Sequence, residues 1–187
     1  MKTKIPLALA EGIATKFMDE LRQDCERIEI VGSIRRRKPE VGDFELLFIP
    51  KVENRRINGD MFNRANMSLA DITLGNWLSH GIVSKRPGAK GQFSWGDKNK
   101  FAIHNASGFA CDFFATTAEN WWNSLVIRTG GKDTNLLLTT GAHKLGRTLN
   151  AYGCGVTESD GTVIPATSEE DVFRLCGVEY QKPEDRV

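Results

Sequence analysis

The chain has 187 residues, enough for one ordinary domain or for two small ones packed together. Its 25 lysines and arginines nearly balance its 24 aspartates and glutamates, which argues against a wholly basic nucleic-acid coat and against an acidic disordered tail. Hydrophobic residues make up 40% of the chain, a globular composition, and no apolar run approaches the roughly 20 residues of a membrane helix, so we expect no membrane association.

The N-terminal segment has the basic and apolar parts of a secretion signal, but its apolar run ends at Glu11 after six residues. A signal needs roughly 7 to 15, so we expect a cytoplasmic protein. The four cysteines are far apart and form no CxxC pair, which favours free thiols over zinc ligands or disulfides. No heptad pattern or apolar stripe stands out, and we expect a monomer.

The first part of the chain alternates helical and extended patterns. Apolar residues spaced by three and four after Pro6 predict a first helix. Two short apolar runs flank the basic loop RRRKPEVG and predict strands, and the run FACDFFAT alternates as a strand does. Such a series predicts an α+β fold, a mixed sheet with helices on one face. We expect helices over 7–23 and 60–80 and strands over 28–33, 43–50 and 109–116.

The pattern changes near residue 117, where we place a domain boundary between residues 1–117 and 118–187. Two helices joined by the turn TGGK come first, followed by short strands of a hairpin-like sheet. The segment TSEEDVFRLCG then predicts a capped helix, with Ser168 as the N-cap and Gly177 as the stop. We expect helices over 118–128 and 132–146 and strands near 148–152, 155–157 and 162–164.

A carboxylate pair follows the basic loop. Asp43 and Glu45 are two residues apart, so both side chains point to one face of a strand. Neighbouring carboxylates repel each other unless a hard cation lies between them, and Mg²⁺ commonly takes one or two carboxylates together with substrate phosphates. Asp112, on a later strand, is a candidate third ligand. Three carboxylates can hold two metal ions about 4 Å apart, the geometry for moving a phosphoryl or nucleotidyl group.

The residues before this pair suit an anionic substrate. Ser33 can donate a hydroxyl hydrogen bond, the run from Arg35 to Lys38 supplies positive charge, and Gly32 and Gly42 can act as backbone pivots around a triphosphate. Acids two residues apart are also common on solvated strand faces, so the pair by itself leaves both interpretations open. The preceding Gly-Ser and the arginines favour a metal site.

The stretch GSIRRRKPEVGDFELL resembles the signature of the family X (polymerase β-like) DNA polymerases, members of the nucleotidyltransferase superfamily. The opening Lys4-Ile5-Pro6 resembles the start of that family's palm domain. Further on, CDFFATTAENWWNSLVIRTGGKDTN resembles its third-carboxylate strand, connecting helix and Thr-Gly turn, and EEDVFRLCGVEYQKPEDR resembles its C-terminal helix and ending. The resemblance covers nearly the whole chain and implies a nucleotidyltransferase palm over 1–117 and a C-terminal nucleotide- and DNA-binding domain over 118–187.

The resemblance also implies roles for single residues. Asp43 and Glu45 would bridge two Mg²⁺ or Mn²⁺ ions, and Asp112 would bind the catalytic ion and help to ionise the primer 3′-hydroxyl. The remaining roles concern the nucleotide: Gly32, Ser33, Arg36, Gly42 and Lys4 at its phosphates, Thr129 and Gly130 along the sugar, and Asn135 near the base.

Several positions depart from the family pattern. Glu45 stands where the family normally has Asp, and Ile127-Arg128 replaces a Tyr-Phe pair that helps to exclude the ribose 2′-hydroxyl. Ala110 and Phe114 stand where the family often has arginines beside the third carboxylate. We therefore expect weak discrimination between dNTP and rNTP, and we expect the arginine relay that supports the third carboxylate to be missing.

Contacts to DNA are expected from basic residues of both parts. The window 81–104 carries five lysines and arginines against one aspartate. Phosphate contacts of this kind position a protein on DNA without reading its sequence. We expect a minimal form of the family with nothing corresponding to its N-terminal lyase domain. The candidate DNA contacts are Lys85, Arg86, Lys90, Arg128 and Lys132.

These features predict a DNA-directed DNA polymerase of the family X type, adding dNTPs to a primer 3′ end in DNA repair or gap filling. A nucleotidyltransferase that acts on RNA or protein shares the acidic cluster and stays open as an alternative. A catalytically silent DNA-binding module is the third, and the three converging acids argue against it.

Overall fold

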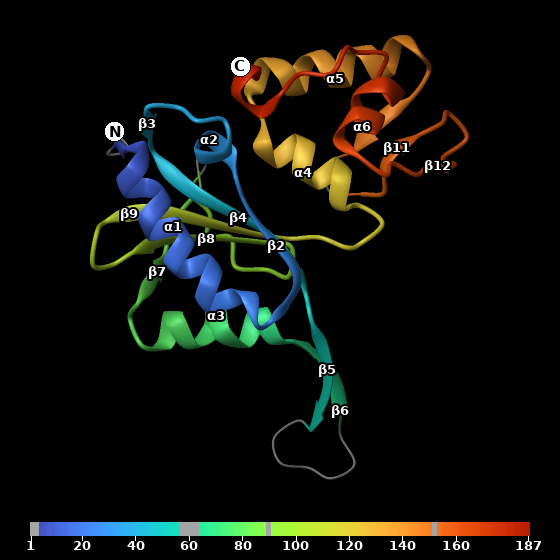
Figure 1. The fold of residues 1–187 in the computed structure, drawn as a ribbon. Helices are drawn as coiled ribbons and strands as arrows, with labels where there is room; N and C mark the ends of the chain where they lie inside the picture. The colour runs from blue at the N-terminus through green and yellow to red at the C-terminus, as the bar shows by residue number, and fades with distance from the viewer. Residues whose placement is uncertain (1–3, 57–63, 89–90, 151–152) are drawn as a thin grey trace.

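The computed structural model describes residues 4–56, 64–88, 91–150 and 153–187. Its centre is a five-stranded sheet in the order β2-β4-β9-β8-β7 (Figure 1). The pair β4 and β9 is parallel, and the other neighbours are antiparallel, so the sheet is mixed as expected. The five strands are β2 (Cys25–Val31), β4 (Asp43–Pro50), β9 (Phe109–Ala115), β8 (Asn99–His104) and β7 (Val83–Lys85).

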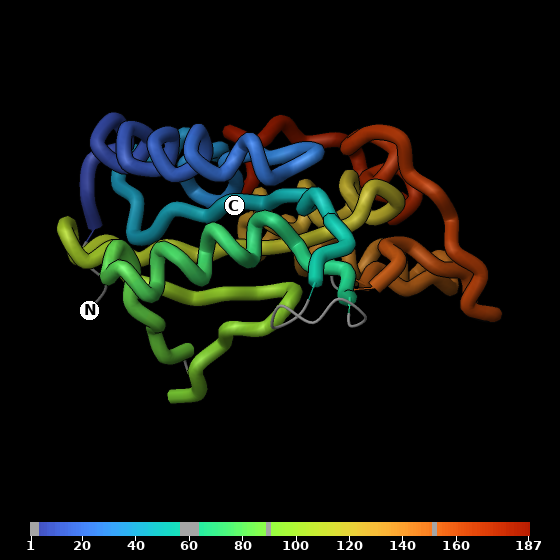
Figure 2. Tube along the Cα trace, turned by 90° about the horizontal axis from the view of Figure 1, so that it is seen from below, coloured from blue at the N-terminus to red at the C-terminus, as the bar shows by residue number. Residues whose placement is uncertain are grey.

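Two helices cover one face of this sheet, α1 (Leu7–Arg22) and α3 (Leu69–Ser79) (Figures 1 and 2). Their apolar stripes meet the inward residues of the alternating strands, because successive side chains of a strand point to opposite faces. Phe17 of α1 lies 4.9 Å from Trp77 of α3 and 5.1 Å from Phe44 of β4, measured between ring centroids. The expected α+β layer with these helices on one face is confirmed.

The region after β4 differs from the prediction of a helix over 60–80. Residues Arg64–Ser68 form strand β6, which pairs with β5 (Val52–Arg56) in a hairpin that projects from the sheet (Figure 1). The helix begins only at Leu69, where the Ser68 hydroxyl accepts a hydrogen bond from the Asp71 amide as an N-cap. Residues 60–63 lie outside the described part of the chain. The prediction was wrong because the cap and the cross-strand pairing outweighed a helical spacing of apolar residues.

The C-terminal part builds a second core of its own. Helix α4 (Trp121–Thr129), α5 (Lys132–Lys144) and α6 (Glu169–Leu175) pack around Leu138 and Phe173, beside a small antiparallel sheet. Ser168 caps α6 as expected, since its hydroxyl accepts a hydrogen bond from the Asp171 amide. The sheet consists of β10 (Thr148–Asn150), β11 (Gly155–Thr157) and β12 (Val163–Ile164); residues 151–152 of the expected first strand lie outside the described residues.

The remaining elements are short. Strand β1 (Ile5–Pro6) pairs with β3 (Glu40–Val41), and the turn Pro183–Asp185 follows α6. The single-turn helix α2 (Gly32–Arg35) begins where β2 ends, so Gly32 and Ser33 belong to a helix rather than to the expected strand end. No helix among the described residues has the length and apolar character needed to cross a membrane.

A buried ion network joins the two parts. Arg35 of α2 donates two hydrogen bonds of 2.8 Å to Glu169 of α6, and the fully buried Arg186 donates a third of 3.0 Å. Trp121 and Leu125 of α4 also pack on Leu47 and Phe114 of the sheet. The domain boundary between residues 1–117 and 118–187 remains a proposal.

We predict that Arg186→Met destabilises the protein by about 3–5 kcal/mol, because removing one partner of a buried pair leaves Glu169 with less compensating charge. Urea unfolding followed by circular dichroism measures this change.

The control is Arg174→Met, which breaks the exposed pair with Asp171 and should cost below about 1 kcal/mol. Equal losses in the two variants would contradict a stabilising role for the buried network.

Candidate active site

Three carboxylates share one end of the sheet. In the parallel pair of β4 and β9, Glu45 lies directly opposite Asp112, and Asp43 stands two residues earlier on β4. The alternation of strand side chains puts Asp43, Glu45 and Asp112 on the same face, away from the core beneath α1 and α3. The sheet therefore brings Asp112 together with Asp43 and Glu45, which lie 69 and 67 residues before it in the sequence.

Gly32 makes room for the longest of these side chains. It has φ +67°, a left-handed conformation that favours glycine, and a Cβ added there would collide with the carboxyl group of Glu45. The Gly-Ser turn and the carboxylate pair are thus a single packed unit. Glu45, one methylene longer than Asp, reaches beneath the first residue of α2.

Burial is the main reason that the pKa of Glu45 is raised to about 8, and the neighbouring negative charges of Asp43 and Asp112 act in the same direction. Arg128 and Arg36 oppose this shift because their positive charges favour the ionised carboxylate. Crowded acids of this kind are the setting in which a bound cation is most favourable.

Arg86 contacts the third carboxylate directly. Its Nη2 lies 2.5 Å from Oδ1 of Asp112, and the two side chains are only 18% and 9% exposed. No group of three Asp, Glu, His or Cys side chains in the described ranges has the geometry of a metal site. Three carboxylates on one face, with the pKa of Glu45 raised by burial and by its acidic neighbours, nevertheless form a donor set that suits Mg²⁺ or Mn²⁺.

The turn before the carboxylates has buried polar atoms that suit an anionic group. The Ser33 hydroxyl and the Nε of Arg36 are buried and have no hydrogen-bond partner among the described residues. Lys4 precedes β1, and the antiparallel register of Ile5 with Val41 places it at the same end as Gly42. Buried polar groups are normally paired, so these orphan donors indicate a place for phosphate oxygens.

The Thr-Gly turn lies against the same arginines. Arg36 donates to the carbonyl of Thr129, and Arg35 donates to the Thr129 hydroxyl at 2.7 Å. Gly130 is close to the Arg36 guanidinium, so the turn adjoins the proposed phosphate site. The amide of Asn135 donates to the Ile127 carbonyl at 3.0 Å, while its buried Oδ1 has no partner among the described residues.

The candidate DNA contacts differ from one another in exposure and in their partners. Lys85 is exposed and lies 5.6 Å from the Trp95 ring centroid, and Lys132 is exposed at the start of α5. Arg86 is committed to Asp112, a pairing that needs the strand order and that the sequence alone did not indicate. Lys90 lies outside the described residues. A role of these residues in binding DNA stays a prediction.

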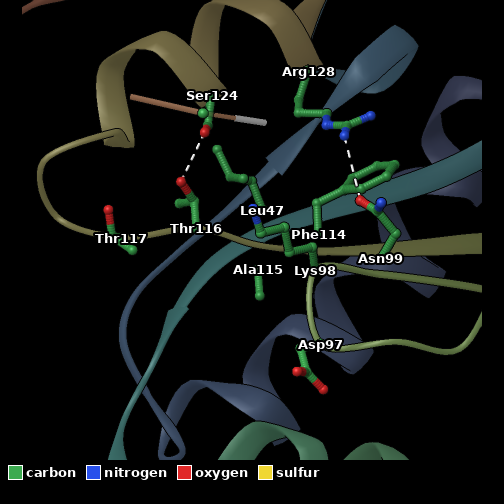
Figure 3. A pocket seen from close by; sticks show the side chains of 11 residues that line it. Leu47, Asp97, Lys98, Asn99, Phe114, Ala115, Thr116, Thr117, Ser124 and Arg128 are labelled. Atoms are coloured by element: carbon green, nitrogen blue, oxygen red, sulfur yellow. Dashed lines mark hydrogen bonds between the residues drawn. The ribbon is translucent and has the colours of Figure 1, made fainter. Parts of the chain in front are cut away.

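Arg128 turns toward the sheet. Its guanidinium lies 3.7 Å from the ring centroid of Phe114, and Nη2 donates to Oδ1 of Asn99 at 3.4 Å (Figure 3). These residues line a cavity of about 300 Å³ between the sheet and α4, together with Leu47. On its other side, Thr116 and Ser124 share a hydrogen bond of 2.7 Å. Arg128 therefore contributes positive charge near Glu45 from the C-terminal part.

The raised pKa of Glu45 predicts a pH-dependent stability in the absence of metal. The folded protein holds the Glu45 proton up to about pH 8, whereas the unfolded chain loses it near 4.5, so stability falls as the pH rises between these values. Glu45→Gln should remove this fall and raise the melting temperature at pH 8. Thermal unfolding in EDTA from pH 5 to 9 measures it, and parallel curves for the two proteins would contradict it.

The chain is similar to known proteins in part of its sequence and in its fold. Residues 124–187 match the family described as DNA polymerase beta thumb. A crystal structure of Leishmania infantum polymerase beta in a ternary P/T complex matches with a TM-score of 0.69 and 19% identity, over 99% of this chain and 77% of that chain. No curated protein matches the sequence. The chain therefore shares the fold of polymerase beta, and its residues 124–187 are similar to the polymerase beta thumb family.

Proposed function

We propose that this chain is a DNA polymerase of the family X type, which adds dNTPs to a primer 3′ end and releases pyrophosphate. The observation that carries the proposal is the row of acids on β4 and β9 beside the α2 turn, with the Thr-Gly turn of the thumb joined to that turn by Arg35 and Arg36. Carboxylates for metal ions, hydrogen-bond donors for phosphates and a turn that could lie along the sugar are close together here, and this combination suits nucleotidyl transfer. The repair of short gaps is the setting we propose.

In this proposal Asp43, Glu45 and Asp112 hold two divalent cations, which would neutralise developing charge on the phosphates and activate the attacking hydroxyl. Asp112 lies on the neighbouring strand and would face the primer 3′-hydroxyl. The protein's own contribution is positioning and charge compensation.

The phosphates would lie against α2. Ser33 and the Arg36 Nε are buried donors without partners among the described residues, so a triphosphate would satisfy them. Gly32, Gly42 and Lys4 line the same turn and strand end. Thr129 and Gly130 would follow the sugar, and Asn135 would offer its free carbonyl oxygen toward the base.

We predict that Asp43→Ala and Asp112→Ala each lower kcat/KM for templated extension about a thousandfold or more, roughly 4 kcal/mol of transition-state stabilisation. Primer extension on a one-nucleotide gap, a recessed end and a single strand, with Mg²⁺ or Mn²⁺, measures this loss. The matched control is Asp19→Ala, an exposed acid on α1 outside the site, which should retain wild-type rates.

Extension that survives in either variant would refute the metal assignment. Absence of extension on all three substrates by the wild-type chain would instead favour the alternative acceptor, RNA or protein, because the palm chemistry is the same.

A second prediction concerns the sugar. Ile127 and Arg128 stand before the Thr-Gly turn, in place of the Tyr-Phe pair that helps to exclude the ribose 2′-hydroxyl, and Arg128 is stacked on Phe114. We expect kcat/KM for dNTP and rNTP to differ by less than about tenfold, or ~1.4 kcal/mol. Ile127→Tyr should increase the preference for dNTP, with the exposed Leu9→Tyr on α1 as control. Strong rejection of rNTP by the wild-type protein would contradict this interpretation.

A further inference from the structure

Arg86 reaches the active-site acids from a distant strand. The register puts Glu45, Asp112 and Phe101 directly opposite one another on β4, β9 and β8. Arg86 follows β7, and its amide donates to the Phe101 carbonyl at 2.9 Å. Its guanidinium then lies 5.4 Å from the Phe101 ring centroid and ends on Asp112. Arg86 is thus the last member of a row that crosses β4, β9 and β8 and ends just after β7.

The contact is largely removed from water. With 18% and 9% of the two side chains exposed, the pair is a charge-assisted hydrogen bond in a low-dielectric setting. Breaking such a pair leaves a buried charge and is costly. The Arg86 side chain is therefore a fixed part of this site, in contrast to the exposed Lys85 one residue earlier.

No cation can support Asp112 from its own strand. Its same-face neighbours on β9 are Ala110 and Phe114, which have no charge. Positive charge has to arrive from other elements, and Arg86 contacts the Asp112 carboxylate directly. Oδ1 of Asp112 is occupied by this arginine, yet the same carboxylate is the proposed ligand of the catalytic ion.

We propose that Arg86 is a positioning residue for Asp112, which holds its carboxylate while no divalent cation is bound and gives up Oδ1 when a cation binds. This inference rests on the proposed function, in which Asp112 is a metal ligand. The cation then competes with a guanidinium for one oxygen. Arg86 accordingly lowers metal affinity and, in exchange, keeps Asp112 oriented in the metal-free protein.

The test is the affinity for Mn²⁺ alone, measured on the full chain by electron paramagnetic resonance, with and without dATP. We expect Arg86→Gln to bind Mn²⁺ about tenfold more tightly, since the competitor is gone. Its melting temperature in EDTA should fall, and Mn²⁺ should raise it by more than in the wild type. Arg86→Lys retains a charge on a shorter side chain and should be intermediate.

The matched control is Lys100→Gln. It breaks the ion pair at 2.7 Å between the buried Lys100 of β8 and the part-exposed Asp71 of α3. Lys100 is next to Phe101 on β8 and points to the opposite face of the sheet. It should lower the melting temperature without changing Mn²⁺ affinity. This control separates a general loss of stability from a specific effect on the site, and Arg86→Lys carries the test if Arg86→Gln does not fold.

Unchanged or weaker Mn²⁺ binding in both Arg86 variants would overturn the inference. A loss of DNA affinity with no change in Mn²⁺ affinity would also overturn it, and would identify Arg86 as a phosphate contact. The proposed function fails differently. It fails if Asp112→Ala binds Mn²⁺ as well as the wild-type chain does, whatever the Arg86 variants show.

Discussion

The crowding of three carboxylates at one end of the sheet is the constraint on which the rest of the site depends. Glu45 and Asp112 face each other across parallel strands, and burial, followed by repulsion from Asp43 and Asp112, raises the pKa of Glu45. Nearby arginines partly offset this cost, among them Arg86 on Asp112. The left-handed Gly32 gives the Glu45 carboxyl its space, so the turn that precedes the acids is shaped by them. A divalent cation would relieve the same repulsion, so the charge crowding that is unfavourable in the metal-free protein would favour the metal binding that the proposed reaction needs.

The C-terminal part is held to this site by charge as well as by apolar packing. Arg35 links α2 to Glu169 of α6, while Arg36 next to it donates to the Thr129 carbonyl. The Trp121 ring stacks on the Arg27 guanidinium at 4.2 Å and packs on the sheet. Consecutive arginines therefore connect the turn beneath the proposed phosphates to α4 and α6 of the C-terminal part. A displacement of this part would directly change the surroundings of the turn over residues 32–36.

Local sequence signals were reliable wherever a cap or an apolar period was strong. Helix α1, strand β4 and the capped α6 follow their patterns closely, since apolar periodicity matches the buried face and Ser168 satisfies free amides. The hairpin of β5 and β6 escaped prediction. Its strands are largely exposed and carry Arg55 and Arg56 instead of alternating apolar residues. The sequence pattern that normally predicts a strand is therefore absent. The Ser68 cap was the signal that could have moved the start of α3.

By itself, the sequence determined the chemical inventory of the site: Gly32-Ser33, the arginines after it, Asp43, Glu45 and Asp112, and the Thr-Gly turn. Short spacing within one strand is enough to put Asp43 and Glu45 on one face. Only the tertiary structure decided which groups compensate these acids. The contacts of Arg86 with Asp112 and of Arg128 with Phe114 join residues of separate elements, and they depend on the order and register of β4, β9, β8 and β7. Strand order is a property of the whole folded chain, because each pairing is selected by packing across the sheet rather than by the residues next to it.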